Sequence, residues 1–349
     1  MFDPEKLLRP HLQSLVPYSS ARDDYQGEEG VFLDANENPL GSITESKWNR
    51  YPDPYQRTLK AKIGEVKGVN PVNIFLGNGS DEPIDLLFRA FCEPGVDEVI
   101  INPPTYGMYR VSADINNVAV KEVLLTKSYD LDVEGIKAAI TPKSKLLFIC
   151  APNNPTGNDL SIRKIEEVLA AFNGLVIIDE AYIDFTDRPS FIHQLDKYPN
   201  LIVLQTFSKA WGLAALRLGM AYASEQVIGI LNKIKPPYNL SGLTQQTVLE
   251  ALENAASKDE MVGEILENRA ELNEALENLD LIEKVYPTAA NFILVKVKGA
   301  TKLYTDLIEK KVIVRDRSRV ALCEGGLRIT VGTKFENFRL IQALKELES

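Results

Sequence analysis

Cysteine and histidine are scarce in this chain of 349 residues, which contains three cysteines and two histidines. Cys92, Cys150 and Cys323 lie far apart in the sequence, and the first two stand in apolar runs. An odd number of distant cysteines favours buried free thiols in a reducing compartment over disulfides. Because histidines are so few and no cysteines are paired, we also expect no transition-metal site.

An excess of positive charge is missing as well. The chain has a formal net charge of −10 and a pI near 5.0. Proteins that follow a nucleic-acid backbone need surplus lysine and arginine, so we expect no nucleic-acid partner. No apolar run approaches the length of a membrane span, and the first residues lack the apolar core of a signal peptide. These absences predict a cytoplasmic protein that has no membrane partner.

Short apolar runs, by contrast, are abundant and alternate with amphipathic helical segments. Apolar strands are expected at residues 31–33, 74–76, 99–101, 146–150, 175–178 and 201–204, and helices at 59–66, 84–91 and 162–172. Continuous apolar strands separated by helices are typical of a parallel-rich sheet covered on both faces. We therefore predict an α/β fold, in which ligands bind beyond the carboxyl ends of the strands.

The pattern changes toward the C-terminus. A long helix is expected at 264–279, followed by strands at 292–297, 312–314 and 327–331 and by helices at 303–310 and through Leu344. These segments describe a compact α+β unit. We divide the chain into an N-terminal arm (1–30), a large domain (31–280) and a small domain (281–349), and the first part of the large domain is also a candidate to pack with the small one.

A glycine-containing turn precedes one of the predicted helices. Gly77 and Gly79 permit close backbone approach, and Ser80 and Asp81 are placed to cap the helix. Free N–H groups at a helix start bind anions. A dinucleotide fingerprint is excluded because Glu82 occupies the place of its third glycine. On this motif alone, a phosphate cradle and an ordinary strand–turn–helix corner remain equally open.

Lys209 stands in a loop that follows the predicted strand at 201–204. Hydroxyl-bearing Thr206 and Ser208 precede it, and Arg217 follows eight residues later. An amine beside hydroxyls and a guanidinium suits a lysine that forms a Schiff base next to a phosphate. A lone lysine at a strand end is more often a solvated side chain, so the assignment depends on the neighbouring motifs.

Two further polar residues follow buried strands in the same way. Asn154, Asp179 and Lys209 are separated by about one strand–helix unit each. An amide, a carboxylate and an amine at one edge of the sheet suit pyridoxal phosphate: Asp179 would keep the pyridine nitrogen protonated, Asn154 and Tyr182 would hydrogen-bond the ring oxygen, and Tyr106 would stack on the ring. Separately, Asp179 is also a possible helix cap and Asn154 part of a plain turn. Jointly, the residues favour the cofactor site.

Eight motifs occur in an order that resembles a known family. They are ANENP at 35–39, RYPDP at 50–54, GNGSDE at 77–82, PPTY at 103–106, PNNPTG at 152–157, DEAY at 179–182, TFSKAWGLAALRLG at 206–219 and LRITVGT at 327–333. Together they resemble fold-type I pyridoxal-phosphate-dependent aminotransferases, and among these most closely the histidinol-phosphate aminotransferase family. One departure is Ala215, where the family pattern often has glycine.

The resemblance implies a large domain with a mixed, mostly parallel seven-stranded sheet and a small domain that combines the N-terminal segment with the C-terminal unit. It implies catalytic roles for Lys209, Asp179 and Tyr182. The implied cofactor-binding set is Gly79, Ser80, Asp81, Tyr106, Asn154, Asp179, Tyr182, Thr206, Ser208, Lys209 and Arg217, with Tyr51 from the partner subunit of a homodimer.

The implied reaction is the transamination of L-histidinol phosphate with 2-oxoglutarate, which gives imidazole-acetol phosphate and L-glutamate in histidine biosynthesis. Arg328 would bind the glutamate carboxylate, and Tyr18 and Asn36 would line the substrate pocket. Arg315 follows the predicted strand at 312–314, and we expect it to join Arg328 at the substrate anion. For the alternating Arg317 and Arg319, a solvated strand edge is an equally good interpretation.

The alternatives to this function are another enzyme of the same fold, a transcription regulator and an inactive scaffold. An aromatic-amino-acid aminotransferase or a threonine-phosphate decarboxylase of the same fold remains an alternative. A transcription regulator that borrows this fold would need a DNA-binding region ahead of residue 30, which thirty turn-rich residues cannot supply. An inactive scaffold is disfavoured because Lys209, Asp179 and Arg217 are all present.

Overall fold

The computed structural model describes residues 2–18 and 30–348. Its centre is a seven-stranded sheet in the order β1-β7-β6-β5-β4-β2-β3. The strands are β1 (Ile74–Asn78), β2 (Glu98–Ile101), β3 (Ala119–Glu122), β4 (Ser144–Cys150), β5 (Leu175–Asp179), β6 (Leu201–Thr206) and β7 (Leu218–Tyr222). Neighbours from β3 to β6 run parallel, whereas β7 is antiparallel to both β1 and β6. The predicted mixed, mostly parallel sheet is confirmed.

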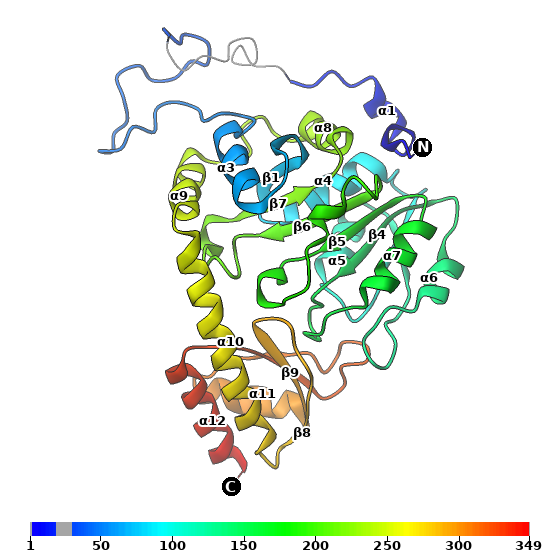
Figure 1. Ribbon diagram of the computed structural model, residues 1–349, viewed down its shortest axis with the longest axis vertical. Helices are drawn as coiled ribbons and strands as arrows, with labels where there is room; N and C mark the ends of the chain where they lie inside the picture. The colour runs from blue at the N-terminus through cyan, green and yellow to red at the C-terminus, as the bar shows by residue number, and fades with distance from the viewer. Residues whose placement is uncertain (1, 19–29, 349) are drawn as a thin grey trace.

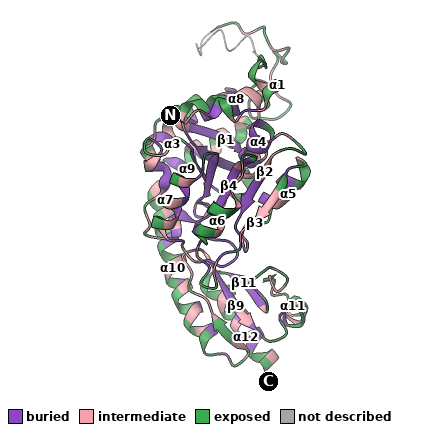
Figure 2. Ribbon diagram, turned by 90° about the vertical axis from the view of Figure 1, so that its right-hand side faces the viewer, coloured by how far each residue is buried: buried purple, intermediate pink, exposed green. Residues whose placement is uncertain are grey.

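Helices cover both faces of this sheet, which explains why its strands are apolar without interruption. On β4, Leu147 and Ile149 belong to one core cluster, whereas Leu146 and Phe148 belong to the other. The first cluster includes side chains of α3 (Arg57–Lys67), α6 (Val133–Ala139), α7 (Ile162–Ala171) and α9 (Gly242–Leu252). The second includes α4 (Asp81–Phe91), α5 (Met108–Ile115) and α8 (Glu225–Ile234). Figure 2 shows the buried strands between helices with exposed outer faces.

A smaller antiparallel sheet lies at the other end of the molecule, in the order β10-β11-β9-β8. Its strands are β8 (Ile282–Val285), β9 (Phe292–Val297), β10 (Arg315–Asp316) and β11 (Gly326–Thr330). It packs with α11 (Ala300–Glu309), α12 (Lys334–Glu348) and the end of α10 (Ala255–Glu277). Figure 1 shows α10 running from the large sheet to the small one, so this helix joins the two units.

Several expected elements differ from the structure. Residues 31–33 form no strand, because Val31 and Leu33 are 88% and 85% exposed and lie against no sheet. Residues 312–314 form no strand either, since the chain first pairs with β11 at Arg315. Helix α10 begins nine residues before the expected start. Its first turns are mostly exposed and carry little apolar periodicity, so only Asn254, an N-cap residue type that makes no side-chain cap hydrogen bond here, marks its start in the sequence.

The N-terminal segment lies away from the small sheet. Helix α1 (Pro10–Gln13) is anchored by Arg9, whose backbone N–H donates to the carbonyl of Ala90 at 2.9 Å. Residues 30–56 run past α3 and α9, at the end of the large sheet that lies opposite the small one (Figure 1). All three cysteines are buried and free, as the sequence predicts.

The described residues contain neither a candidate membrane span nor a candidate metal-binding cluster. Across 2–18 and 30–348, no helix combines the length and the apolar character needed to cross a membrane. Within those ranges there is also no cluster of three or more histidine, cysteine, aspartate or glutamate side chains placed to hold a metal ion.

Candidate active site

A cavity of about 220 Å³ lies where β4, β5 and β6 end. Because these strands are parallel, their carboxyl ends meet at one edge, and the polar residues that follow them converge. The small sheet closes the cavity from the other side through Arg317 and Arg328. The predicted residues that line the cavity are Gly79, Ser80, Asp81, Tyr106, Asn154, Asp179, Tyr182, Thr206, Ser208, Lys209, Arg217 and Arg328.

One end of the cavity is built for an anion. Gly79 has φ +67°, and a Cβ there would lie 2.8 Å from Nη2 of Arg217. A Cβ on Gly219 would lie 2.2 Å from the backbone nitrogen of Ser80, so both positions must be glycine for β7 to approach the turn. Helix α4 starts at this turn, and Ser80 makes no side-chain cap. Free N–H groups at the start of α4 therefore face a guanidinium across a narrow space, which suits a phosphate.

Arg217 is held in place by its backbone. Arg217 has a left-handed backbone with φ 53°, and its carbonyl accepts a hydrogen bond from the Gly79 N–H at 2.6 Å. The Nη1 of its side chain donates to Oγ of Ser208 at 3.5 Å and to the carbonyl of Ala214 at 3.2 Å. Its Nη2 lies 3.8 Å from Oδ2 of Asp81. One guanidinium thus connects the Ser208 hydroxyl with the start of α4.

The opposite end holds a buried carboxylate. Asp179 is 3% exposed, accepts from the Tyr109 hydroxyl at 2.7 Å and from the Ala181 backbone N–H at 3.1 Å. Burial, with a smaller contribution from the charge of Asp81, raises the pKa of Asp179 to about 6, although the hydrogen bonds from Tyr109 and Ala181 oppose the shift. A desolvated carboxylate at a cavity wall is stabilised by a cationic partner, and a protonated ring nitrogen would supply one.

Tyr109 was missed by the sequence interpretation. It lies on α5, is fully buried, and stacks on Phe148 with ring centroids 4.7 Å apart. Tyr106 touches its ring edge-on at 5.5 Å and donates its own hydroxyl to Asp81 at 3.1 Å. The available signal was a tyrosine on the buried side of an amphipathic helix, because a buried phenol needs a hydrogen-bond partner.

Lys209 stands between the two ends of the cavity. Its Nζ lies 5.7 Å from the centre of the Tyr182 ring. Partial desolvation and the charges of Arg328 and Arg217 lower the pKa of Lys209, against the opposing effect of Asp179 and Asp81. A lowered pKa increases the fraction of neutral amine, the form that attacks a carbonyl carbon.

A chain of hydrogen bonds connects the large domain to β11. Asn154 donates from Nδ2 to the Tyr182 hydroxyl at 3.3 Å and accepts at Oδ1 from Nη1 of Arg328 at 2.6 Å. The Arg328 guanidinium also lies over the Phe292 ring at 5.2 Å. Asn154 and Tyr182 are buried, so their positions are tightly defined.

The arginine-rich segment gives an unexpected result. Arg317 lines the cavity, whereas Arg315 is exposed and stands opposite Arg328 in the sheet register without contributing to the lining. Nε of Arg317 is buried and has no hydrogen-bond partner within residues 2–18 and 30–348. Burial and the charges of Arg328 and Arg315 lower the pKa of Arg317. Arg319 is exposed.

Three further predicted residues, besides Arg315, lie outside this cavity in the single chain. Tyr18 is 71% exposed, at the end of the first described range. Asn36 and Tyr51 line a second cavity of about 430 Å³ together with Trp48. Tyr51 stacks on Tyr238 with ring centroids 4.5 Å apart. The chain therefore does not bring these three to its own Lys209.

Known proteins match this chain over almost its full length. A family model described as aminotransferase class I and II matches residues 25–344. A curated protein of Cytophaga hutchinsonii named histidinol-phosphate aminotransferase is 56% identical over 344 residues, which cover 99% of each chain. Another of that name from Christiangramia forsetii is 53% identical over 350 residues, covering 100% of this chain and 99% of its own.

Solved structures agree with this result. Histidinol-phosphate aminotransferase from Clostridium acetobutylicum has a TM-score of 0.80 at 25% identity and covers 86% of this chain and 91% of its own. The fold is shared with histidinol-phosphate aminotransferase from Sinorhizobium meliloti in complex with pyridoxal-5'-phosphate, which has a TM-score of 0.81 at 23% identity over 97% and 96% of the two chains. By family model, sequence identity and fold alike, this chain belongs to the aminotransferase class I and II family, among the relatives named histidinol-phosphate aminotransferase.

Proposed function

We propose that this chain is a pyridoxal-phosphate-dependent transaminase that converts L-histidinol phosphate and 2-oxoglutarate into imidazole-acetol phosphate and L-glutamate. The observation that carries the proposal is one cavity that holds the Lys209 amine between the buried Asp179 carboxylate and the anion site at Arg217. The names of the full-length relatives support the choice of substrate. We place this reaction in the cytoplasm, as part of histidine biosynthesis.

Each end of the cavity would hold a different part of the cofactor. The start of α4, Ser208 and Arg217 would bind the phosphate, and the ionised Asp179 would accept a hydrogen bond from the protonated ring nitrogen. Asn154 and Tyr182 would hydrogen-bond the ring oxygen. When bound, pyridoxal phosphate supplies an aldehyde that accepts an amino group and a ring that withdraws electrons.

The residues of the chain would perform the proton transfers. The ε-amino group of Lys209 would take the proton from the substrate carbon and return it on the cofactor side, because a lowered pKa keeps the amine competent as a base near neutral pH. Asp179 would stay ionised beside the ring nitrogen, where a positive charge lowers the pKa of a neighbouring carboxyl. Tyr182 would orient the ring through its hydroxyl.

The substrate anions would be bound by the small-domain wall. Histidinol phosphate carries a phosphate, whereas glutamate carries two carboxylates, and a guanidinium fork pairs with either group. Arg328 would bind both substrates. Arg317 now stands beside it as a second candidate, with Arg315 two residues earlier in the same segment.

A homodimer would complete the site. Tyr18, Asn36 and Tyr51 do not reach Lys209 within one chain, and we propose that Tyr51 approaches the cofactor phosphate of the partner while Tyr18 and Asn36 line the substrate pocket. The division into an arm (1–30), a cofactor-binding domain (31–280) and a small domain (281–349) belongs to the same proposal. It is supported by the start of the small sheet at Ile282.

The decisive experiment is a half-reaction assay on the purified, cofactor-loaded protein. Histidinol phosphate, phenylalanine and threonine phosphate are offered separately, and the loss of the visible cofactor absorbance and the ketone or amine products are measured. We expect histidinol phosphate to react with the highest kcat/KM. A preference for phenylalanine, or carbon dioxide release from threonine phosphate, would overturn the substrate assignment.

A further inference from the structure

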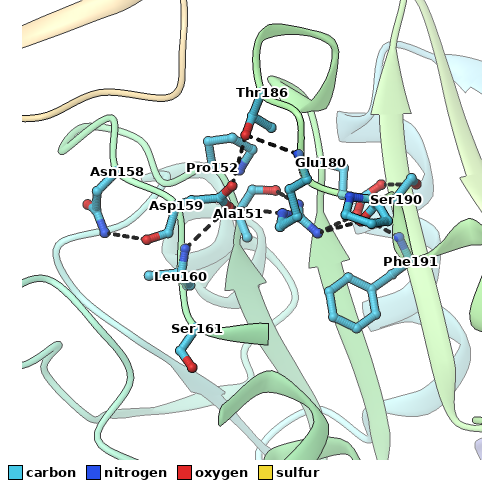
Figure 3. Close-up of polar contacts among 12 residues, drawn as sticks. Ala151, Pro152, Asn158, Asp159, Leu160, Ser161, Glu180, Thr186, Ser190 and Phe191 are labelled. Atoms are coloured by element: carbon cyan, nitrogen blue, oxygen red, sulfur yellow. Dashed lines mark hydrogen bonds and ion pairs between the residues drawn. The ribbon is translucent and has the colours of Figure 1, made fainter. Parts of the chain in front are cut away.

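A buried ion cluster lies directly behind the candidate active site. It consists of Arg188 and the carboxylates of Asp159 and Glu180, and the side chains of Arg188 and Glu180 are almost entirely removed from solvent. None of the three lines the active cavity. Figure 3 shows Asp159 and Glu180 on either side of Ala151, where the loop after β4 passes the end of β5.

The guanidinium of Arg188 donates to its chain neighbour, the Pro189 carbonyl, at 3.3 Å and to three groups on other segments. Its Nε donates to Oδ1 of Asp159 at 2.9 Å, and its Nη2 donates to the Ala151 carbonyl at 2.8 Å. Ala151 and Asp159 are the two ends of the loop that carries Asn154. One side chain therefore fixes both ends of this loop.

The third contact reaches the next strand. Nη1 of Arg188 lies 3.2 Å from Oε1 of Glu180, the residue that follows Asp179. Oε2 of Glu180 accepts from Nε2 of Gln205 at 3.0 Å, and Gln205 belongs to β6, four residues before Lys209. The cluster thus touches the ends of β4, β5 and β6, the strands that present Asn154, Asp179 and Lys209.

Glu180 is fixed from a further direction. It accepts from the Phe191 backbone N–H at 2.9 Å and from the Ser190 hydroxyl (Figure 3). The chain from Arg188 to Phe191 therefore folds back onto the strand ends. Both oxygens of the buried carboxylate have partners, so Glu180 has one defined position.

Buried ion pairs are poor sources of net stability, because desolvation offsets most of their attraction. A planar fork with five donors can, however, meet several acceptors at fixed angles, which a single ammonium cannot do. The geometry of Arg188 is of this kind, since its guanidinium meets two carboxylates and two backbone carbonyls.

We propose that Arg188 is a positioning residue for the cofactor site: it holds the loop of Asn154 and the strand end of Asp179 at the separation that the cofactor ring requires. The inference rests on the proposed function, since it assigns that spacing to pyridoxal phosphate. It predicts that the contacts of Arg188 influence cofactor binding although no atom of this residue touches the cofactor.

The test compares Arg188→Lys with a matched control, Arg9→Lys. Arg9 also donates to one carboxylate, Glu93 at 3.1 Å, and to one backbone carbonyl, Arg89 at 3.2 Å, but it does so at the far end of α4. Two quantities are measured for each variant: the affinity of the cofactor-free protein for pyridoxal phosphate, and amide hydrogen exchange over residues 150–160 and 179–183 in that protein.

We expect Arg188→Lys to weaken cofactor affinity by roughly tenfold. This is the lower end of the losses in affinity caused by changing residues that hydrogen-bond to the ligands of a metal site. We expect faster exchange in both segments and a shifted pH midpoint of the visible cofactor absorbance. Arg9→Lys should match the wild type in all three measurements. A folded Arg188→Lys protein with a lower Tm but unchanged affinity, exchange and midpoint would overturn the proposal.

Two outcomes separate this inference from the proposed function. If the wild type does not bind pyridoxal phosphate, the proposed function fails, whereas the exchange comparison still decides whether Arg188 holds the two strand ends. If Arg188→Lys does not fold, Asp159→Asn replaces it, because this change keeps the pair of Arg188 with Glu180. Faster exchange over 150–160 with a several-fold weaker affinity then supports the proposal, and wild-type values in both measurements overturn it.

Discussion

The large-domain wall of the cavity consists of side chains at the ends of β4, β5 and β6, and two of them, Asn154 and Asp179, are buried and hydrogen-bonded to neighbouring groups. The small-domain wall consists of Arg317 and Arg328, which stand beside β10, a strand of two residues. Asn154 and Asp179 are fixed before any ligand arrives, because both are buried and hydrogen-bonded. The second wall offers guanidinium groups that have few fixed partners. This difference suggests a rigid wall for the cofactor and an adaptable wall for two substrates of different shape.

The largest effect is expected from the large-domain wall, where Lys209→Ala removes the only amine among the described residues that line the cavity. Loss of a general base of this kind slows the chemical step by about 10²–10⁴-fold or more. The variant should still bind the cofactor weakly and without a covalent bond. Borohydride reduction of the wild type followed by peptide mapping provides the check, and a labelled peptide that lacks Lys209 would refute the assignment.

Asp179→Asn separates the two roles of a buried carboxylate. A neutral amide cannot hold the proton of the ring nitrogen, so we expect the half-reaction to slow by roughly 10²–10³-fold while cofactor affinity changes less. Rapid-mixing measurement of the half-reaction and titration of the cofactor give the two values. Turnover close to that of the wild type would mean that Asp179 is a structural residue.

The same substitution should stabilise the cofactor-free protein. The folded-state pKa of Asp179, about 6, lies above the ordinary value of 3.8. Its protonated form therefore stabilises the fold fully below pH 3.8, and this contribution is lost as the pH rises toward and through 6. The shift means that the ionised Asp179 lowers the free energy of unfolding by about 3 kcal/mol at neutral pH. Urea unfolding should show the advantage of Asp179→Asn growing as the pH rises from 3.8 to about 6 and levelling off above it, and an advantage that is independent of pH would contradict the shift.

Arginine substitutions test the adaptable wall and should have smaller effects. Arg328→Ala removes a charge-assisted hydrogen bond worth about 1.5–3 kcal/mol, so kcat/KM should fall roughly 10- to 100-fold in both half-reactions. Arg315→Ala and Arg317→Ala then form a matched pair. The sequence predicts that Arg315→Ala impairs the half-reaction with the phosphate substrate most. The cavity lining instead predicts that Arg317→Ala has the larger effect on that half-reaction. An unchanged histidinol-phosphate half-reaction assigns the substituted residue to the solvated edge.

The smallest effect on cofactor binding is expected from Tyr51, which a second subunit would contribute to the site. Tyr51→Phe removes one hydroxyl and should raise the Kd of the cofactor several-fold, in line with the loss of about 1 kcal/mol for one hydrogen bond. Mixing Tyr51→Phe with Lys209→Ala subunits should restore some competent sites. Full activity in a dilute monomer would show that each site is built from one chain.

Much of the fold followed from local patterns. Apolar runs that end in polar residues are expected to form buried parallel strands, and the carboxyl ends of such strands share an edge. This argument brought together Asn154, Asp179 and Lys209, and the structure places all three at one cavity. Antiparallel β7 (Leu218–Tyr222) is not among the strands expected from the sequence.

The sequence by itself determined which residues stand at the strand ends, because the order of apolar and polar residues decides where a buried strand must stop. Only the tertiary structure decided which distant groups meet there. Alternation places Arg315 and Arg317 on the same side of their segment, so no local pattern tells which one reaches the cavity. Tyr109 and Arg188 likewise find their partners about 70 and 37 residues away in the chain. Such contacts depend on how separate elements pack, and a buried polar group is satisfied by whatever the packing brings within reach.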